Sequence, residues 1–129
     1  MAEADAFLAK AEESLASAED DYAKARYNSC ARNLYYAAFQ AAVAALLAES
    51  IRPGGRWEHE FVRSEFSGRL VHRRKLYDAS LRALLAKAFA RRVDADYTEK
   101  MLKQRDVARL LIQARQMIRQ VEERAHGRR

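Results

Sequence analysis

The chain has 129 residues, of which 33% are charged and 50% are hydrophobic, and its formal net charge is +6. A chain of this length is expected to form one domain and to bury a core without metal ions or disulfide bonds. Its only cysteine, Cys30, excludes an internal disulfide, which suits a reducing cytoplasm. No histidine is near Cys30 in sequence, so it is interpreted as a small buried hydrophobic residue rather than a nucleophile.

Composition also bears on fold class and location. Only one proline and four glycines occur, which favours an all-helical protein because these residues are the weakest helix formers. The N-terminus lacks the basic lead and apolar run of a signal peptide, and the longest apolar stretch is too short to span a membrane. We therefore expect a cytoplasmic protein without membrane association.

The charge is unevenly distributed along the chain. Residues 1–50 contain four basic and eight acidic side chains, whereas residues 51–129 contain twenty basic and ten acidic side chains. The basic C-terminal part is compatible with a polyanionic partner such as a nucleic acid. A solvated basic face without any partner explains the same distribution equally well.

Two helices are predicted in the first part of the chain. Between residues 3 and 21, apolar residues recur every three or four positions and predict one buried stripe, formed by Leu8, Ala11, Leu15, Ala18 and Tyr22. A short connection at 21–27 lets the second helix, residues 28–49, run antiparallel to the first. From Leu34 to Ala48 only Gln40 is plainly polar, and such a helix must be surrounded by other helices.

A loop at residues 50–55 contains the only proline and two of the four glycines, so the second helix ends there. The third helix is predicted to begin near residues 57–59. Its apolar residues share one face and are expected in the core: Val62, Phe66 and Leu70. An exposed basic connector is expected at 72–75.

The fourth helix is predicted to begin at Asp78, a good N-cap residue, and to end near Arg92. Residues 93–97 then lie just past its end. Apolar positions at helical spacing predict a fifth helix over 104–124. The expected fold is an all-α, antiparallel up-and-down bundle of four to five helices. It forms one domain over residues 1–129, with its core at about 5–124 and a flexible basic tail at 125–129.

Motifs for cofactors and metal ions are missing from the sequence. Neither a phosphate-binding loop of the form G-x-x-x-x-G-K-[ST] nor a strand-borne dinucleotide fingerprint occurs. The three histidines, His59, His72 and His126, are far apart, and neither H-E-x-x-H nor C-x-x-C is present. We therefore expect no cofactor and no metal ion.

The most informative polar group is Arg92 with Asp96 and Tyr97. An arginine and an acid at this spacing can share a helix face or bracket a helix end. One interpretation is a phosphate-binding arginine with polar neighbours. The other is an intrahelical ion pair beside a packed tyrosine, and the pattern alone favours this one.

A second group lies at the start of the apolar helix. Arg32 and Tyr36 are four residues apart and share one face, where an arginine can stack on a tyrosine ring. A buried arginine needs an acidic partner, and Asp96 is a suitable candidate. His59, at the start of the third helix, is a further candidate for the same cluster, although capping or a surface hydrogen bond explains it as well.

Together these features resemble a known family. The string A-R-N-L-Y-Y-A-A-F-Q-A-A-V-A-A-L-L at residues 31–47 precedes a helix that opens at His59 and contains Phe66. The string R-V-D-A-D-Y at residues 92–97 follows, and then a last helix rich in Ala, Ile and Val. Over about residues 5–124 this order resembles the small stand-alone prokaryotic branch of the HEPN family (higher eukaryotes and prokaryotes nucleotide-binding).

The resemblance implies an antiparallel bundle of four or five helices that forms a homodimer. Many HEPN proteins resemble toxins or ribonucleases encoded beside a minimal nucleotidyltransferase that acts as antitoxin. Active members place an R-x(4–6)-H motif at a dimer cleft. There the histidine helps to activate a ribose 2′-hydroxyl and the arginine stabilises the phosphate charge, without a metal ion.

The sequence departs from that motif. Arg92 corresponds to the motif arginine, but Asp96 and Tyr97 stand where the histidine would fall. Arg119 and His126 match the spacing formally, but in the last helix and the tail, so this match is attributed to chance. Arg92 is expected to keep a phosphate-binding role. Asp96 would have to be desolvated to act as a substitute base, because an exposed aspartate has a pKa near 4.

The expected function is a HEPN-type module that associates with nucleotide or RNA and forms one half of a toxin–antitoxin-like pair with a minimal nucleotidyltransferase. The expected binding residues are Arg92, Asp96, Tyr97, Arg32, Tyr36 and His59, and the catalytic candidates are Arg92 and Asp96. Two alternatives stay open: a metal-independent ribonuclease toxin and a non-catalytic helical adaptor. A homodimer is also expected, with three aromatic residues interpreted as exposed: Trp57, Phe61 and Phe89.

Overall fold

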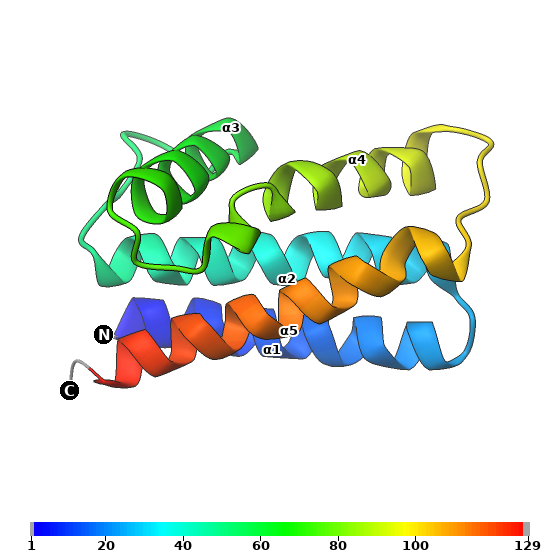
Figure 1. Ribbon diagram of the computed structural model, residues 1–129, viewed down its shortest axis with the longest axis horizontal. Helices are drawn as coiled ribbons and strands as arrows, with labels where there is room; N and C mark the ends of the chain where they lie inside the picture. The colour runs from blue at the N-terminus through cyan, green and yellow to red at the C-terminus, as the bar shows by residue number, and fades with distance from the viewer. Residues whose placement is uncertain (1, 128–129) are drawn as a thin grey trace.

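The computed structural model describes residues 2–127, and within this range the chain is helical and contains no β-strand. In chain order the elements are α1 (Ala2–Ala23), α2 (Tyr27–Ala48), α3 (His59–Arg63), the π-helix η1 (Ser64–Arg73), the 3₁₀ turn η2 (Ala79–Leu81), α4 (Leu84–Tyr97) and α5 (Gln104–Gly127). Figure 1 shows α1, α2 and α5 running along the bundle, with α3 and α4 side by side above α2. The expected all-α bundle is confirmed.

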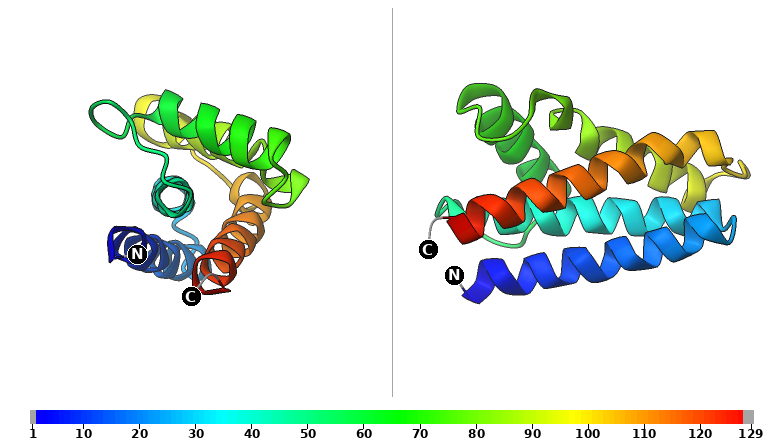
Figure 2. Two further views of the ribbon diagram at one scale, coloured as in Figure 1. Left: turned by 90° about the vertical axis from the view of Figure 1, so that its left-hand side faces the viewer. Right: turned by 60° about the horizontal axis from the view of Figure 1, so that its bottom comes forward.

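Helix α2 lies at the centre of the bundle. In the end view of Figure 2 the other helices surround it. Every residue from Ala41 to Leu47 is buried, as expected of a helix that is apolar on nearly all sides. The many alanines of α2 let the neighbouring backbones approach closely. Its exposed side is confined to the N-terminal half, where Tyr36 is 38% exposed.

The turn between α1 and α2 is held by a buried carboxylate. Asp21 is 6% exposed and accepts hydrogen bonds from Ser29 Oγ at 2.7 Å and Asn33 Nδ2 at 3.0 Å. Arg26 Nε donates a third bond at 2.9 Å. Burial raises the pKa of Asp21, but these hydrogen bonds and the Arg26 charge outweigh it and hold the pKa below its ordinary value.

The third predicted helix is present but changes its hydrogen-bonding pattern. One α-helical turn, α3, continues directly as η1, in which hydrogen bonds join residues five apart. The residues predicted to be in its core are fully buried: Val62, Phe66 and Leu70. Because η1 extends to Arg73, only the second half of the expected connector at 72–75 is non-helical.

Both boundaries of the fourth helix differ from the prediction. Asp78 caps the short η2 turn, where its carboxylate accepts the backbone N–H of Ser80 at 2.9 Å, and α4 begins only at Leu84. At the other end, residues 93–97 form the last turn of α4 instead of a segment beyond it. No proline or glycine interrupts this stretch, and ion pairs along the helix stabilise it: Arg91–Asp94 and Arg92–Asp96.

Helix α5 extends to Gly127, so residues 125–127 of the predicted flexible tail are helical. The rest of that prediction, residues 128–129, lies outside the described residues. The apolar stripe predicted for α5 is buried: Val107, Leu110, Leu111, Ala114, Met117, Ile118 and Val121. Within residues 2–127, none of the helices combines the length and apolarity needed to cross a membrane.

A second buried carboxylate joins the C-terminal end of α2 to η1 and α5. The side chain of Glu49 is 3% exposed; Arg74 Nη2 donates to Oε1 at 3.0 Å and Arg124 Nε donates to Oε2 at 3.2 Å. Removing one partner of such a buried ion pair is strongly destabilising. Asp21 and Glu49 therefore anchor opposite ends of the central helix.

Substitution of Asp21 by alanine is expected to lower the free energy of unfolding by about 2 kcal/mol, because three donors lose a charged acceptor. Asp20 provides a matched control, since its side chain is 54% exposed and exposed ion pairs contribute little. Urea unfolding of wild type, Asp21→Ala and Asp20→Ala measures the effect. Equal losses in the two variants would contradict this role of Asp21.

The stabilising effect of Asp21 is expected to depend on pH. The pKa of Asp21 is lowered in the folded state, so its stabilising contribution is fully present above the unfolded-state pKa near 4. It is lost as the pH falls through the lower pKa of the folded state. The difference in unfolding free energy between wild type and Asp21→Ala should therefore shrink in acid and stay constant between about pH 5 and 7.

Candidate functional site

Five of the six side chains predicted to bind nucleotide or RNA gather where α2, α3 and α4 meet. Arg32 and Tyr36 are one turn apart on α2, and Arg92 and Asp96 are one turn apart on α4. Figure 1 shows α4 lying along α2. His59, the first residue of α3, reaches the group through a neighbouring tyrosine. The site thus joins three elements that are far apart in the sequence.

One carboxylate is shared by two arginines of this group. Arg32 Nε donates a hydrogen bond to Asp96 Oδ1, and Arg92 Nε lies 3.5 Å from Asp96 Oδ2. The side chain of Asp96 is only 19% exposed, whereas those of Arg32 and Arg92 are 40% and 26% exposed. Two cations therefore face one anion, and the local charge is positive.

Arg92 lies over two aromatic rings. Its guanidinium carbon lies 5.2 Å from the centre of the Tyr35 ring and 5.4 Å from that of Tyr36, both within the range of cation–π attraction. Its Nε is buried and has no hydrogen-bond acceptor in residues 2–127, because 3.5 Å to Asp96 exceeds the usual length of a charged hydrogen bond. Such an unsatisfied buried donor is uncommon and calls for an explanation.

His59 is packed into an aromatic cluster beside Arg92. Its ring stacks on Phe89 with 4.2 Å between centres, and its Nδ1 lies 2.9 Å from the hydroxyl oxygen of Tyr35. Burial lowers the pKa of His59; the Glu60 charge opposes this shift, and the Arg63 and Arg92 cations add to it. The imidazole is therefore mainly neutral at pH 7, and a neutral imidazole can accept a proton.

Tyr35 connects the two halves of the site. It packs edge-on against Tyr36 and Phe89, with 5.9 and 5.6 Å between ring centres. Burial raises the pKa of its hydroxyl, while the Arg92 cation acts in the opposite direction. Sequence reasoning did not assign Tyr35 or Phe89 to the site. The available signal was spacing, because Phe89 precedes Arg92 by one helical turn and Tyr35 follows Arg32 by one.

Tyr97 is not brought into this cluster, since it is 73% exposed on the last turn of α4. The three aromatic residues interpreted as exposed are in fact half-buried and packed within the chain: Trp57, Phe61 and Phe89. Among residues 2–127, the exposed large apolar side chains are others: Tyr36, Tyr97, Met101 and Ile112. That prediction was wrong because helical spacing does not reveal which neighbouring ring covers a side chain.

The ion-pair interpretation of Arg92 and Asp96 is also realised, as the two side chains form a pair four residues apart within α4. It does not account for the whole arrangement, because Arg32 of α2 bonds the same carboxylate. Cys30 is fully buried, and burial, with Asp21 nearby, raises the pKa of its thiol to about 11. This confirms that Cys30 is a buried hydrophobic residue rather than a nucleophile.

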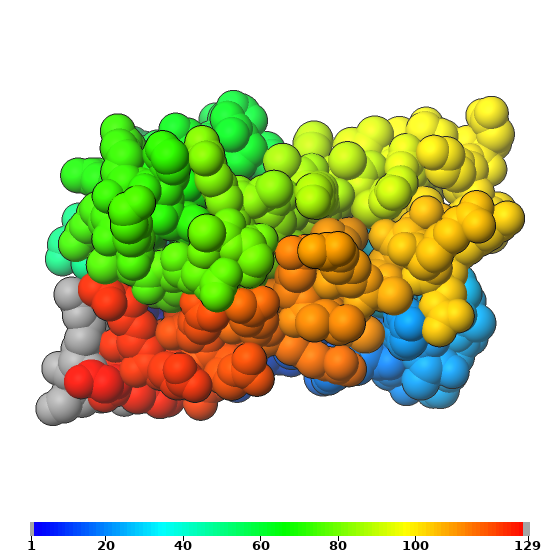
Figure 3. Space-filling model, viewed as in Figure 1, coloured from blue at the N-terminus to red at the C-terminus, as the bar shows by residue number. Residues whose placement is uncertain are grey.

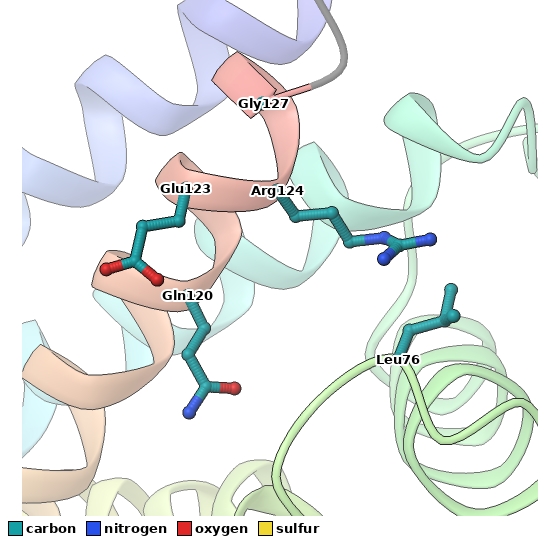
Figure 4. Close-up of a pocket in the computed structure, with 5 residues that line it drawn as sticks. All are labelled: Leu76, Gln120, Glu123, Arg124 and Gly127. Carbon is teal, nitrogen blue, oxygen red and sulfur yellow. The ribbon is translucent and has the colours of Figure 1, made fainter.

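Other places in the molecule are less suited to chemistry. Figure 4 shows residues that line a hollow near the end of α5: Arg124 extends toward Leu76, whereas Glu123 points to the other side. Gln120 Oε1 accepts the backbone N–H of Asp78, and Arg124 bonds Glu49, so these side chains hold the fold together. Within residues 2–127, no three His, Cys, Asp or Glu side chains are grouped closely enough to hold a metal ion.

Fold and site together define an α-helical bundle whose aromatic, cationic site lies between α2 and α4. The sequence model of one protein family, described as HEPN domain, matches residues 4–124. The chain therefore belongs to the HEPN family, which confirms the resemblance at residues 31–47 and 92–97 and makes it a nucleotide- or RNA-related module in general terms. A comparison with curated proteins finds no match to this chain.

Proposed function

We propose that this HEPN protein binds a nucleotide or single-stranded RNA at the site of Arg32, Arg92, Asp96 and Tyr36. We further propose that it forms one half of a toxin–antitoxin-like pair with a minimal nucleotidyltransferase. The observation that carries the binding proposal is the state of Arg92. Its guanidinium is positioned by two rings, and it shares the single carboxylate of Asp96 with Arg32.

Charge and geometry both suit a phosphate. Because Nε is buried, a phosphate would contact the exposed part of the Arg92 side chain, which is 26% exposed. Charge-assisted hydrogen bonds to arginine are strong and directional. Arg32 is the more exposed of the two cations, so it can contact a second oxygen of the same phosphate. Asp96 carries one negative charge and the two arginines carry two positive charges. A bound phosphate would therefore compensate the positive charge that Asp96 leaves.

The rings around Arg92 suit a base or a ribose. Tyr36 is 38% exposed at the edge of the site, and exposed aromatic rings are the usual stacking partners of unpaired bases. Tyr97 lies on the last turn of α4, next to Asp96 in sequence, but it is not part of the cluster. We therefore propose a binding site that uses Tyr36 as its stacking residue and does not use Tyr97.

A metal-independent ribonuclease is the second candidate function, and one observation favours it. The imidazole of His59 is mainly neutral at pH 7, because its pKa is lowered. It contacts the hydroxyl of Tyr35, and the Arg92 guanidinium lies over the Tyr35 ring. We propose that His59 of α3, instead of a residue on α4, supplies the histidine that the motif at Arg92 lacks. It would accept the proton of a ribose 2′-hydroxyl while Arg92 stabilises the phosphate.

Exposed apolar side chains support an interface beside the site. Met101 is 73% exposed, and its Sδ lies 3.3 Å from Asn28 Nδ2 at the start of α2. Tyr97 is also 73% exposed, on the last turn of α4. Apolar groups exposed together favour a protein contact. We propose that a second copy of the chain covers this face.

Substitution of Arg92 by alanine is expected to weaken binding of a short single-stranded RNA at least about tenfold, or 1.4 kcal/mol. Substitution of Asp96 by asparagine is expected to strengthen binding, because both arginines lose their competing anion. A misfolded variant would not bind more tightly, so the opposite signs identify the site. Fluorescence anisotropy at low and high salt measures both effects.

Arg115→Ala serves as the control for this experiment. Arg115 is 49% exposed and pairs with Glu19 of α1, away from the site. If Arg92→Ala and Arg115→Ala weaken binding equally, the RNA contacts the basic surface at large and the proposed site is wrong. Unchanged binding by Arg92→Ala would refute it as well.

The ribonuclease candidate predicts cleavage of a labelled RNA in the presence of EDTA. Both Arg92→Ala and His59→Ala should abolish the cleavage, whereas His72→Ala, an exposed histidine of η1, should leave it unchanged. Absence of cleavage by the wild type, with RNA binding retained, would leave a binding module without catalysis.

The dimer proposal is tested by light scattering, and the pair proposal is tested by co-expression. The purified chain should have the mass of a homodimer, and Met101→Glu should shift it to a monomer because the charge would be buried at the contact. Co-expression with a minimal nucleotidyltransferase encoded beside it should give a stable complex. A monomeric wild type contradicts the dimer, and failure to co-purify contradicts the pair.

A further inference from the structure

A groove between α4 and α5 is lined by four cations. Lys87 and Arg91 lie one turn apart on α4, and Arg105 and Arg109 lie one turn apart on α5. Ala90, Leu110 and Gln113 complete the lining of a hollow of about 460 Å³, in which Asp106 is the only acid. Figure 3 shows the two helices exposed beside each other on one face of the molecule.

The groove gathers in one hollow several cations without an ion-pair partner in the described part of the chain. Arg91 lies 3.2 Å from Asp94 and 3.7 Å from Asp106. Lys87, Arg105 and Arg109 are exposed, and none of them has an ion-pair partner among residues 2–127. Elsewhere some cations are paired with acids, such as Arg63–Glu60 and Arg115–Glu19. Others, such as Arg56 and Arg73, are exposed without an ion pair to any described residue but lie outside the groove.

Like charges that face each other across a groove repel, and they attract counterions. A bound polyanion removes this repulsion and releases the counterions, which is the main source of affinity in nucleic-acid binding. The cations on each wall are four residues apart, or about 6 Å along a helix axis. Two rows at regular spacing suit a repeating anion better than a single phosphate group.

The lining also argues against a protein partner. Interfaces between proteins depend on buried aromatic or large apolar anchors. The groove lining has none, as its apolar residues are Ala90 and the 6% exposed Leu110. Arginine and lysine without apolar anchors are typical of contacts to a sugar–phosphate backbone.

We propose that the α4–α5 groove binds the sugar–phosphate backbone of a nucleic-acid strand, without reading its sequence. Lys87, Arg105 and Arg109 contact successive phosphates, while Asp94 and Asp106 hold Arg91 in place on the groove wall. The inference goes beyond the proposed site at Arg92. Arg92 faces α2 and its neighbour Arg91 faces α5, so the two lie on different flanks of α4.

The test compares wild type with the double variant Lys87→Ala/Arg109→Ala. All substituted side chains are exposed, so the fold should be unaffected. The probe is a fluorescein-labelled oligouridylate long enough to span both helices, titrated over a range of salt concentrations. Loss of two phosphate contacts should lower the slope of log affinity against log salt by about 1.4. Oligodeoxythymidylate should behave in the same way.

The matched control is Arg56→Ala/Arg73→Ala, which removes the same charge from exposed positions outside the groove. An equal drop in slope in the control would overturn the groove proposal, because general surface charge would then explain the binding. An unchanged slope in the groove variant would also overturn it. So would binding of polyglutamate as tight as that of RNA of equal charge, which would indicate an acidic protein as the partner.

Titration with a mononucleotide separates this proposal from the one at Arg92. The groove variant should bind a nucleoside triphosphate as the wild type does, whereas Arg92→Ala should not. A slope that falls only in the groove variant supports the groove even if Arg92→Ala has no effect on either ligand. Loss of mononucleotide binding in the groove variant would overturn the separation of the two sites.

Discussion

Helix α2 has almost no polar side, and this constraint organises the molecule. An apolar helix of 22 residues exposed to water would lose the main favourable term of folding, so every flank must be covered by another helix. Helices α1, α4 and α5 and the α3–η1 segment provide that cover (Figure 2). Buried carboxylates at Asp21 and Glu49 then fix the two ends of α2 to its neighbours.

The same constraint brings the site together. Burial of α2 draws α4 along it, and the polar residues at the N-terminal part of α2 meet the last turn of α4. Asp96 accepts Arg32 from one helix and pairs with Arg92 of the other. Apolar contacts alone would satisfy packing, so the two arginines that share one acid are the feature on which the binding proposal rests.

The sequence predicted some residues of this site and did not predict others. Arg32, Tyr36, Arg92, Asp96 and His59 were identified from spacing and resemblance. Tyr35 and Phe89 were not, because a residue in an apolar stripe is normally a core residue, and its contact with a polar group appears only after packing. The reverse holds for Tyr97, whose position in a polar string suggested a contact that the last turn of α4 does not make.

The sequence by itself determined the helical class, the central position of α2, the core stripes of α1 and α5 and the HEPN membership. Periodicity and composition are local properties and can be recognised without coordinates. The tertiary structure decided that residues 93–97 continue α4, that His59 lies against Tyr35 and that cations of α4 and α5 share a groove. The last two depend on contacts between distant segments, which local patterns do not encode. The end of α4 is stabilised by ion pairs within the helix and also by Arg32 of α2, which bonds Asp96.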